Sequence, residues 1–172
     1  MKYPDAESIL DDLYVQQEMD NCWDNTKNNK CEYGFAIYLV NNPIEVMQYN
    51  EGETMECPNS PGEHVSATVD IEIDEMIVNP TQEDGRYLIG VFHTHPPLTD
   101  CDAGVWREPG PSTLGVDAYD NLNDPVPAFV YDYNVQTLYG GHNENLDVKK
   151  YKYGVQRRDH LKDEHISDFQ WN

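Results

Sequence analysis

The chain has 172 residues, of which 38% are hydrophobic and 11% aromatic, so we expect one folded domain with an ordinary core rather than a disordered segment. The formal net charge of -21 disfavours direct binding to nucleic acid phosphates or anionic membranes and favours a partner with a basic surface. No apolar run approaches membrane-spanning length, and the N-terminal residues lack the apolar core of a signal peptide. We therefore expect a cytoplasmic protein, while signal-independent export, or a place within a larger protein, stays open.

The four cysteines show no Cys-x-x-Cys spacing and so do not suggest a zinc ribbon or a redox pair. An even count permits disulfides, and Cys22 and Cys31 could close a short loop. Because the chain shows no signal peptide, we expect free thiols. Cys101 follows the two histidines described below and could lie near a metal, but a small packed residue is the expectation there.

The N-terminal segment is predicted to form one helix followed by a loop. Residues 4–20 show a helical period, with Ser8 and Asp11 resembling a capping box. The apolar face of this helix is expected to hold Leu10, Leu13, Tyr14 and Gln17. Residues 21–30 are polar and rich in Asn and Lys, which predicts a loop.

Most of the remaining chain is predicted to alternate between strands and loops. The segments with strand-like patterns are 33–40, 44–49, 65–73, 87–96, 128–133, 135–139 and 149–155. The first two are expected to form a hairpin around a turn at 41–43, and the last is expected at a sheet edge. The segments expected as loops or turns are 50–63, 79–85 and 97–111. The loop 97–111 is long enough to cover a functional site.

Further helices are expected at 112–123 and in the charged tail, 156–172. Because strands outnumber helices, we expect an α+β fold, arranged as an α/β/α sandwich around a mixed, curved β-sheet. We expect a single domain, 1–172, with the motif-bearing core at about 32–155 and the helical segment 4–20 before it.

The strongest chemical signal lies at the end of the apolar run 87–96, Tyr-Leu-Ile-Gly-Val-Phe-His-Thr-His-Pro. Residues two apart in a strand point to the same side, so His93 and His95 are expected to aim at a common point where the strand leaves the core. Two neutral imidazoles that converge suit a borderline metal such as zinc. Pro96 has no N–H and ends the strand. The alternative is a chance pair of histidines, each hydrogen-bonded locally.

A catalytic zinc needs three protein ligands and one open position for water. The third ligand is expected from the helix at 112–123, where Asp117 or Asp120 could point at the metal. Hydrolysis also needs a general base that takes a proton from water and passes it to the leaving amine. Glu32, directly before the first predicted strand, is the candidate for this role.

The ordered set Glu32-Tyr-Gly, His93-Thr-His95-Pro96 and Pro111-Ser112 with a following Asp resembles the JAB/MPN (JAMM) family of zinc metallopeptidases. That family is marked by a Glu at the first strand, His-x-His-Pro at a strand end and Ser-x-x-Asp at the start of a helix. The resemblance covers roughly residues 32–132 and implies the cytidine-deaminase-like MPN architecture. It also fits a bacterial JAB-like domain of the toxin or effector type.

The resemblance implies a Zn²⁺ ion held by His93, His95 and Asp117. It implies that Glu32 acts as general base and then as general acid. It further implies that Ser112 donates a hydrogen bond to the developing oxyanion.

The chain departs from the family pattern at two points. The loop between the histidines and Ser112 is longer than in the compact family pattern, and Gly115 stands three residues after Ser112, where the family has Asp. An insertion of two residues restores Asp117 as the ligand, with Asp120 as the fallback.

The function that these residues favour is zinc-dependent hydrolysis of a peptide or isopeptide bond in a peptide or protein substrate, without a nucleic acid or membrane partner. One alternative is a catalytically inactive MPN-type interaction module, in which the departure at Gly115 marks the loss of metal. A second alternative is an acidic decoy that mimics nucleic acid, which the net charge of -21 motivates and which would bind no metal.

Overall fold

The computed structural model describes the two N-terminal helices and seven strands of the chain. It covers residues 4–40, 44–46, 49–58, 60, 63, 67–71, 86–98, 101, 107, 110–111, 126–133, 148–158 and 162–171, with the backbone alone at 46, 86, 87, 153–158 and 162–171. Its helices are α1 (Ala6–Leu10) and α2 (Leu13–Asn29). Its strands are β1 (Cys31–Val40), β2 (Ile44–Val46), β3 (Asn50–Thr54), β4 (Arg86–Thr94), β5 (Pro127–Tyr133), β6 (Val148–Arg158) and β7 (Lys162–Trp171).

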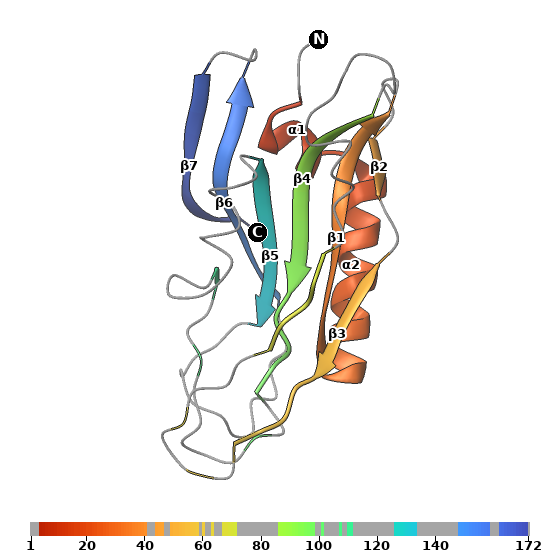
Figure 1. Cartoon of the computed structure of the whole chain (residues 1–172), viewed down its shortest axis with the longest axis vertical. Helices are drawn as coiled ribbons and strands as arrows, with labels where there is room; N and C mark the ends of the chain where they lie inside the picture. Colours follow the sequence, from red (N-terminus) through yellow and green to blue (C-terminus); the bar gives the residue numbers. More distant parts are fainter. Residues whose placement is uncertain are drawn as a thin grey trace.

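The described strands form one open, mixed sheet (Figure 1). The strand order is β2-β1-β4-β5-β6-β7, and β3 also pairs with β1. The pair β4–β5 is parallel, whereas every other pair is antiparallel. The expectation of an α+β fold around a mixed sheet is therefore confirmed.

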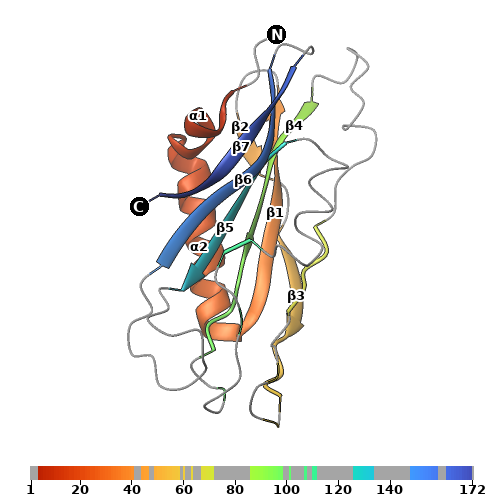
Figure 2. The ribbon, with the colours of Figure 1, turned by 90° about the vertical axis from the view of Figure 1, so that its left-hand side faces the viewer.

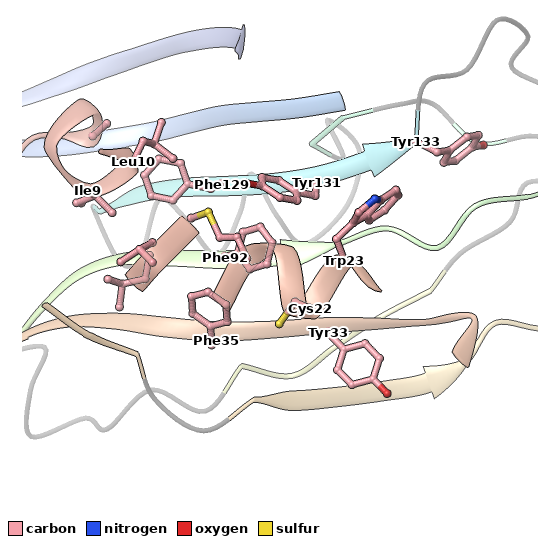
Figure 3. Close-up of a cluster of buried hydrophobic side chains, with 14 of the residues drawn as sticks. Ile9, Leu10, Cys22, Trp23, Tyr33, Phe35, Phe92, Phe129, Tyr131 and Tyr133 are labelled. Atoms are coloured by element: carbon pink, nitrogen blue, oxygen red, sulfur yellow. The ribbon is translucent and has the colours of Figure 1, made fainter. Parts of the chain in front are cut away.

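Both described helices lie on the same face of the sheet, with α2 packed along β1 and β4 (Figure 2). The core between them is rich in aromatic rings (Figure 3). The ring centroids of Phe92 lie 4.9 Å from those of Phe35 and 5.0 Å from those of Tyr131. Rings at such separations pack favourably. These pairs link β1, β4 and β5, and residues of α1 and α2, including Ile9 and Trp23, belong to the same buried cluster. The helix expected at 112–123, which would contribute a second layer, lies outside the described residues.

The N-terminal segment holds two helices where the sequence predicts one. Asp5 caps α1 by accepting the Ser8 N–H at 2.9 Å, and Asp12 caps α2 by accepting the N–H groups of Tyr14 and Val15. The predicted capping box of Ser8 with Asp11 is wrong, because these two Asp side chains satisfy the first N–H groups of their own helices.

The second helix runs through residues 21–29, so the loop predicted at 21–30 is wrong. Its side facing the sheet buries Val15, Met19, Cys22, Trp23 and Thr26. These residues recur at helical spacing, and their burial outweighs the weak helix propensity of the asparagines between them. Of the predicted apolar face, Leu10 is buried as expected, whereas Leu13 is 79% exposed and Tyr14 and Gln17 are exposed as well. Lys30 ends the helix in the left-handed conformation, with φ of 58°.

Three later predictions also need correction. Residues 50–54, expected in a loop, form β3, and residues 67–71, expected in a strand, form neither strand nor helix. The tail, expected to be helical, forms β7 along the edge of β6, so β6 is not an edge strand. Pairing with β7 satisfies the backbone groups that β6 would otherwise leave open, which favours a strand over an isolated charged helix. The turn at 41–43, the turn region 79–85 and the strand at 135–139 lie outside the described residues.

The cysteines divide into two kinds. Cys57 and Cys101 form a disulfide with a Cα–Cα distance of 5.3 Å, which corrects the expectation of free thiols for this pair. Cys22 and Cys31 are buried free thiols, as expected. The bonded pair is separated by 44 residues in the sequence, so only the tertiary fold reveals it.

Candidate metal centre

The parallel strands β4 and β5 finish at the end of the sheet where β1 begins (Figure 1). Of the candidate residues, Glu32, His93 and His95 are described, and they belong to this end of the sheet. In the register of these strands, His93 lies opposite Gly34 on β1 and Val130 on β5. The N–H of His95 donates to the Tyr131 carbonyl at 2.9 Å, which extends the ladder one residue beyond β4. Because side chains alternate, Glu32, His93 and His95 lie on the face opposite the helices.

The two imidazoles converge, as the strand alternation predicts. The Nε2 atoms of His93 and His95 are 3.1 Å apart, and each residue is 6% exposed. In a tetrahedral zinc site, Zn–N bonds of about 2.0–2.1 Å place two ligand nitrogens about 3.3 Å apart. The observed separation is close to that value, so His93 and His95 could supply two of the ligands of a zinc ion.

Glu32 lies beside this pair. It lies within β1 rather than before it and is 6% exposed. Its Oε1 atom is 3.8 Å from the Nε2 atom of His95, which is too long for a direct hydrogen bond. A carboxylate at this separation can accept a proton from a water molecule that lies between it and a metal.

Behind His95, the carboxylate of Asp132 forms the centre of a buried polar cluster. Its Oδ2 atom lies 3.1 Å from Nδ1 of His95 and accepts the Gly110 N–H at 2.8 Å. Its Oδ1 atom accepts from Nη2 of Arg107 at 2.8 Å and from the Tyr133 N–H at 2.8 Å. Asp132 is 0% exposed, so these donors replace water around it completely.

The surroundings of Asp132 keep it ionised. Burial by itself would raise the pKa of this carboxyl. The Arg107 guanidinium, the hydrogen bond with His95 and the Gly110 amide together outweigh burial and hold the pKa below its usual value.

Two residues set the local backbone that carries the histidines. The Thr94 hydroxyl accepts the Tyr33 N–H at 3.0 Å and contacts the Thr26 hydroxyl of α2, so it ties the end of β4 to β1 and to the helix layer. At Gly34, a Cβ atom would lie 2.8 Å from the Phe92 carbonyl oxygen and 3.0 Å from the Ile71 side chain. Only glycine therefore fits opposite His93 without displacing the neighbouring chain.

The structure leaves part of the predicted site undescribed. Ser112, Asp117 and Asp120 lie outside the described residues. Within the described part of the chain, no group of three or more His, Cys, Asp or Glu side chains could hold a metal ion by itself. The sulfur of Cys101 is bonded to Cys57, so Cys101 cannot serve as a thiolate ligand to a metal.

Sequence reasoning missed Asp132 and Arg107. A signal for Asp132 exists, since it is an acid at the end of the apolar run Ala-Phe-Val-Tyr-Asp-Tyr, as the histidines are at the end of theirs. Arg107 carries no comparable signal, because only the fold brings this loop residue to the end of β5.

Comparisons of the chain with protein-family models, with curated proteins and with solved structures find no match. Among the described residues, no helix is long and apolar enough to cross a membrane.

Proposed function

We propose that this protein is a zinc-dependent hydrolase that cleaves a peptide or isopeptide bond, on an MPN-type architecture resembling that of the JAB/MPN metallopeptidases. The observation that carries the proposal is the approach of the two Nε2 atoms of His93 and His95 to 3.1 Å, with the Glu32 carboxylate 3.8 Å from one of them. All three side chains are buried where β4 ends and β1 begins, so they face one another in a site largely closed to solvent.

In this proposal His93 and His95 hold the zinc ion together with an aspartate of the 112–123 segment, Asp117 or Asp120. When bound, zinc would polarise the scissile carbonyl and lower the pKa of a coordinated water to about 7. Glu32 takes the proton of the attacking water and then passes it to the leaving amine.

The proposed role of Ser112 is to donate a hydrogen bond to the oxyanion that develops on the scissile carbonyl. The chain before it supports this role. The Gly110 N–H is bonded to Asp132, which in turn contacts His95, so the loop returns to the end of β5 two residues before Ser112. The extra length of this loop relative to the family pattern is therefore compatible with the proposed site.

The proposed substrate is a peptide or protein with a basic surface, because the net charge of -21 attracts basic partners and repels nucleic acids and anionic membranes. The cytoplasmic location stays a prediction. The disulfide between Cys57 and Cys101 would persist in an oxidising compartment, which favours the alternative of export.

The test is the zinc content of protein purified without added metal, measured together with hydrolysis of a fluorogenic peptide library and of a Gly–Lys isopeptide substrate. We expect stoichiometric zinc in the unmodified chain and in the control His64→Ala, and its loss in His95→Ala. Equal zinc in Asp117→Ala would reject that ligand in favour of Asp120. A chain that holds no zinc would reject the hydrolase and favour the inactive interaction module on the same fold.

A further inference from the structure

The contacts of Asp132 determine which ring nitrogen of His95 carries a proton. Its four close partners among the described residues approach as donors or ring nitrogens, and three of them can only donate: the amides of Gly110 and Tyr133 and the guanidinium of Arg107. The fourth is Nδ1 of His95, at 3.1 Å. An ionised carboxylate only accepts hydrogen bonds, so Nδ1 of His95 must carry a proton to complete the set.

We propose that Asp132 is the positioning residue of the metal centre: it holds His95 in the tautomer with the proton on Nδ1, so that the Nε2 lone pair faces His93. A neutral imidazole carries one ring proton, and placing it on Nδ1 leaves Nε2 as the atom that can bind a metal. The consequence for zinc rests on the proposed function, whereas the tautomer itself does not. Carboxylate partners of this kind orient metal-binding histidines and raise their basicity.

The loop after the histidines fixes Asp132 in turn. Arg107 and Gly110 both bond the carboxylate, one on each oxygen. Gly110 has φ of 82°, a backbone conformation that favours glycine. A Cβ atom there would also lie 3.1 Å from the Tyr151 ring, so both the backbone and the neighbouring ring favour glycine at this position. Arg107 and Gly110 therefore support the carboxylate on its two oxygens and hold it against His95.

The first experiment uses the unmodified, metal-free chain and needs no variant. Long-range ¹H–¹⁵N correlation spectra of the imidazoles at pH 8 distinguish a proton on Nδ1 from a proton on Nε2. We expect His95 in the Nδ1–H form. A spectrum with the His95 proton on Nε2 would overturn the proposal, whatever the chain does with zinc.

The second experiment compares Asp132→Asn with Asp24→Asn, which removes a charge from an exposed residue of α2. An asparagine at 132 has one accepting side only. If its NH₂ group faces His95, it opposes the Gly110 N–H and drives the His95 proton to Nε2. If the NH₂ group faces the other way, it opposes Arg107 and the Tyr133 N–H.

In either orientation we expect Asp132→Asn to bind zinc about 10- to 100-fold more weakly in competition with a chromophoric chelator. Asp24→Asn should bind zinc like the unmodified chain. Arg107→Gln removes the ion pair with Asp132 but leaves the Asp132 carboxylate beside His95. This variant should therefore keep the Nδ1–H signal of His95, although residue 107 holds Asp132 less firmly.

The outcomes separate this inference from the proposed function. Equal zinc affinity in folded Asp132→Asn and in the unmodified chain would reject the positioning role and leave the hydrolase proposal standing. An unmodified chain that shows the Nδ1–H tautomer but binds no zinc would reject the hydrolase and keep the contact between Asp132 and His95. If Asp132→Asn does not fold, the spectrum of the unmodified chain decides.

Discussion

At the scale of single residues, strand alternation brings the two histidines to one side of the sheet, and burial limits what can approach them. His93 lies within the last residues of β4, and His95 follows the strand directly and still bonds to the Tyr131 carbonyl. Glu32 reaches the same point from the start of β1, because β1 runs antiparallel to β4. Three side chains from two strand ends thus meet without any specialised loop.

The first prediction concerns Glu32. We expect Glu32→Gln to keep the fold and bound zinc but to lose about 10²- to 10⁴-fold in hydrolysis, because an amide cannot take a proton from water. The measurement is the rate of peptide hydrolysis at fixed zinc content. Glu53→Gln, on an exposed residue of β3, is the matched control and should match the unmodified chain. Loss of zinc in Glu32→Gln would instead make Glu32 a ligand.

The second prediction concerns the pH dependence of stability at Cys22. Burial, and then the charge of Glu18, raises the pKa of this thiol. The unfolded thiol ionises above a pKa of about 8.5, whereas the folded one stays neutral. Stability is therefore fully present below pH 8.5 and falls above it, by up to about 1.4 kcal/mol per pH unit. Urea unfolding between pH 8 and 10 should show a shallower fall in Cys22→Ala, and an equal fall in both chains would contradict this account.

At the scale of elements, the strands formed by continuous apolar runs were predictable from the sequence. Elements that form only by packing or pairing with another part of the chain were not. The described side chains of β1, β4 and β5 are mostly buried on both faces, so these strands are rich in apolar residues and carry their polar groups near the ends. The helix α2 escaped prediction because its second half is polar in composition and becomes helical through packing against the sheet. The strand β7 escaped because it depends on pairing with β6.

The candidate site divides in the same way. The convergence of the two histidines was accessible from strand alternation alone, whereas Glu32 was predicted from its place before the first expected strand and from the family resemblance. Asp132 required the parallel pairing of β4 with β5, which places it beside His95, and that pairing cannot be deduced from either strand by itself. Arg107 required the path of a long loop. Contacts between residues distant in sequence are set by the whole fold, so local patterns do not reveal them.

The third prediction tests which face of α2 stabilises the fold. Trp23 is 5% exposed on the side that faces the sheet, whereas Leu13 is 79% exposed. We expect Trp23→Ala to lower the free energy of unfolding by about 3–5 kcal/mol, because it leaves a cavity in the aromatic core. Leu13→Ala should change it by less than about 0.5 kcal/mol. Chemical denaturation measures both, and a larger loss in Leu13→Ala would restore the helix face expected from the sequence.

At the scale of the whole molecule, one covalent bond joins the two halves of the candidate site. β1 supplies Glu32, and Cys57 follows β3, the partner of β1, whereas Cys101 follows His95. The disulfide therefore ties the segment after β3 to the loop that leads from the histidines to Arg107 and Gly110. It adds to the hydrogen bonds of Asp132, which hold the same loop at its other end.

The fourth prediction follows from the length of the chain that this bond closes. A crosslink across 44 residues removes enough freedom from the unfolded chain to stabilise the fold by about 4 kcal/mol. Reduction, or Cys57→Ser with Cys101→Ser, should therefore lower the free energy of unfolding by about that amount and weaken zinc binding through the loosened loop. Cys31→Ser is the control, because Cys31 is a buried free thiol. Stability lost without any change in zinc affinity would show that the disulfide supports the fold alone, and that Asp132 is sufficient to hold the loop at the metal centre.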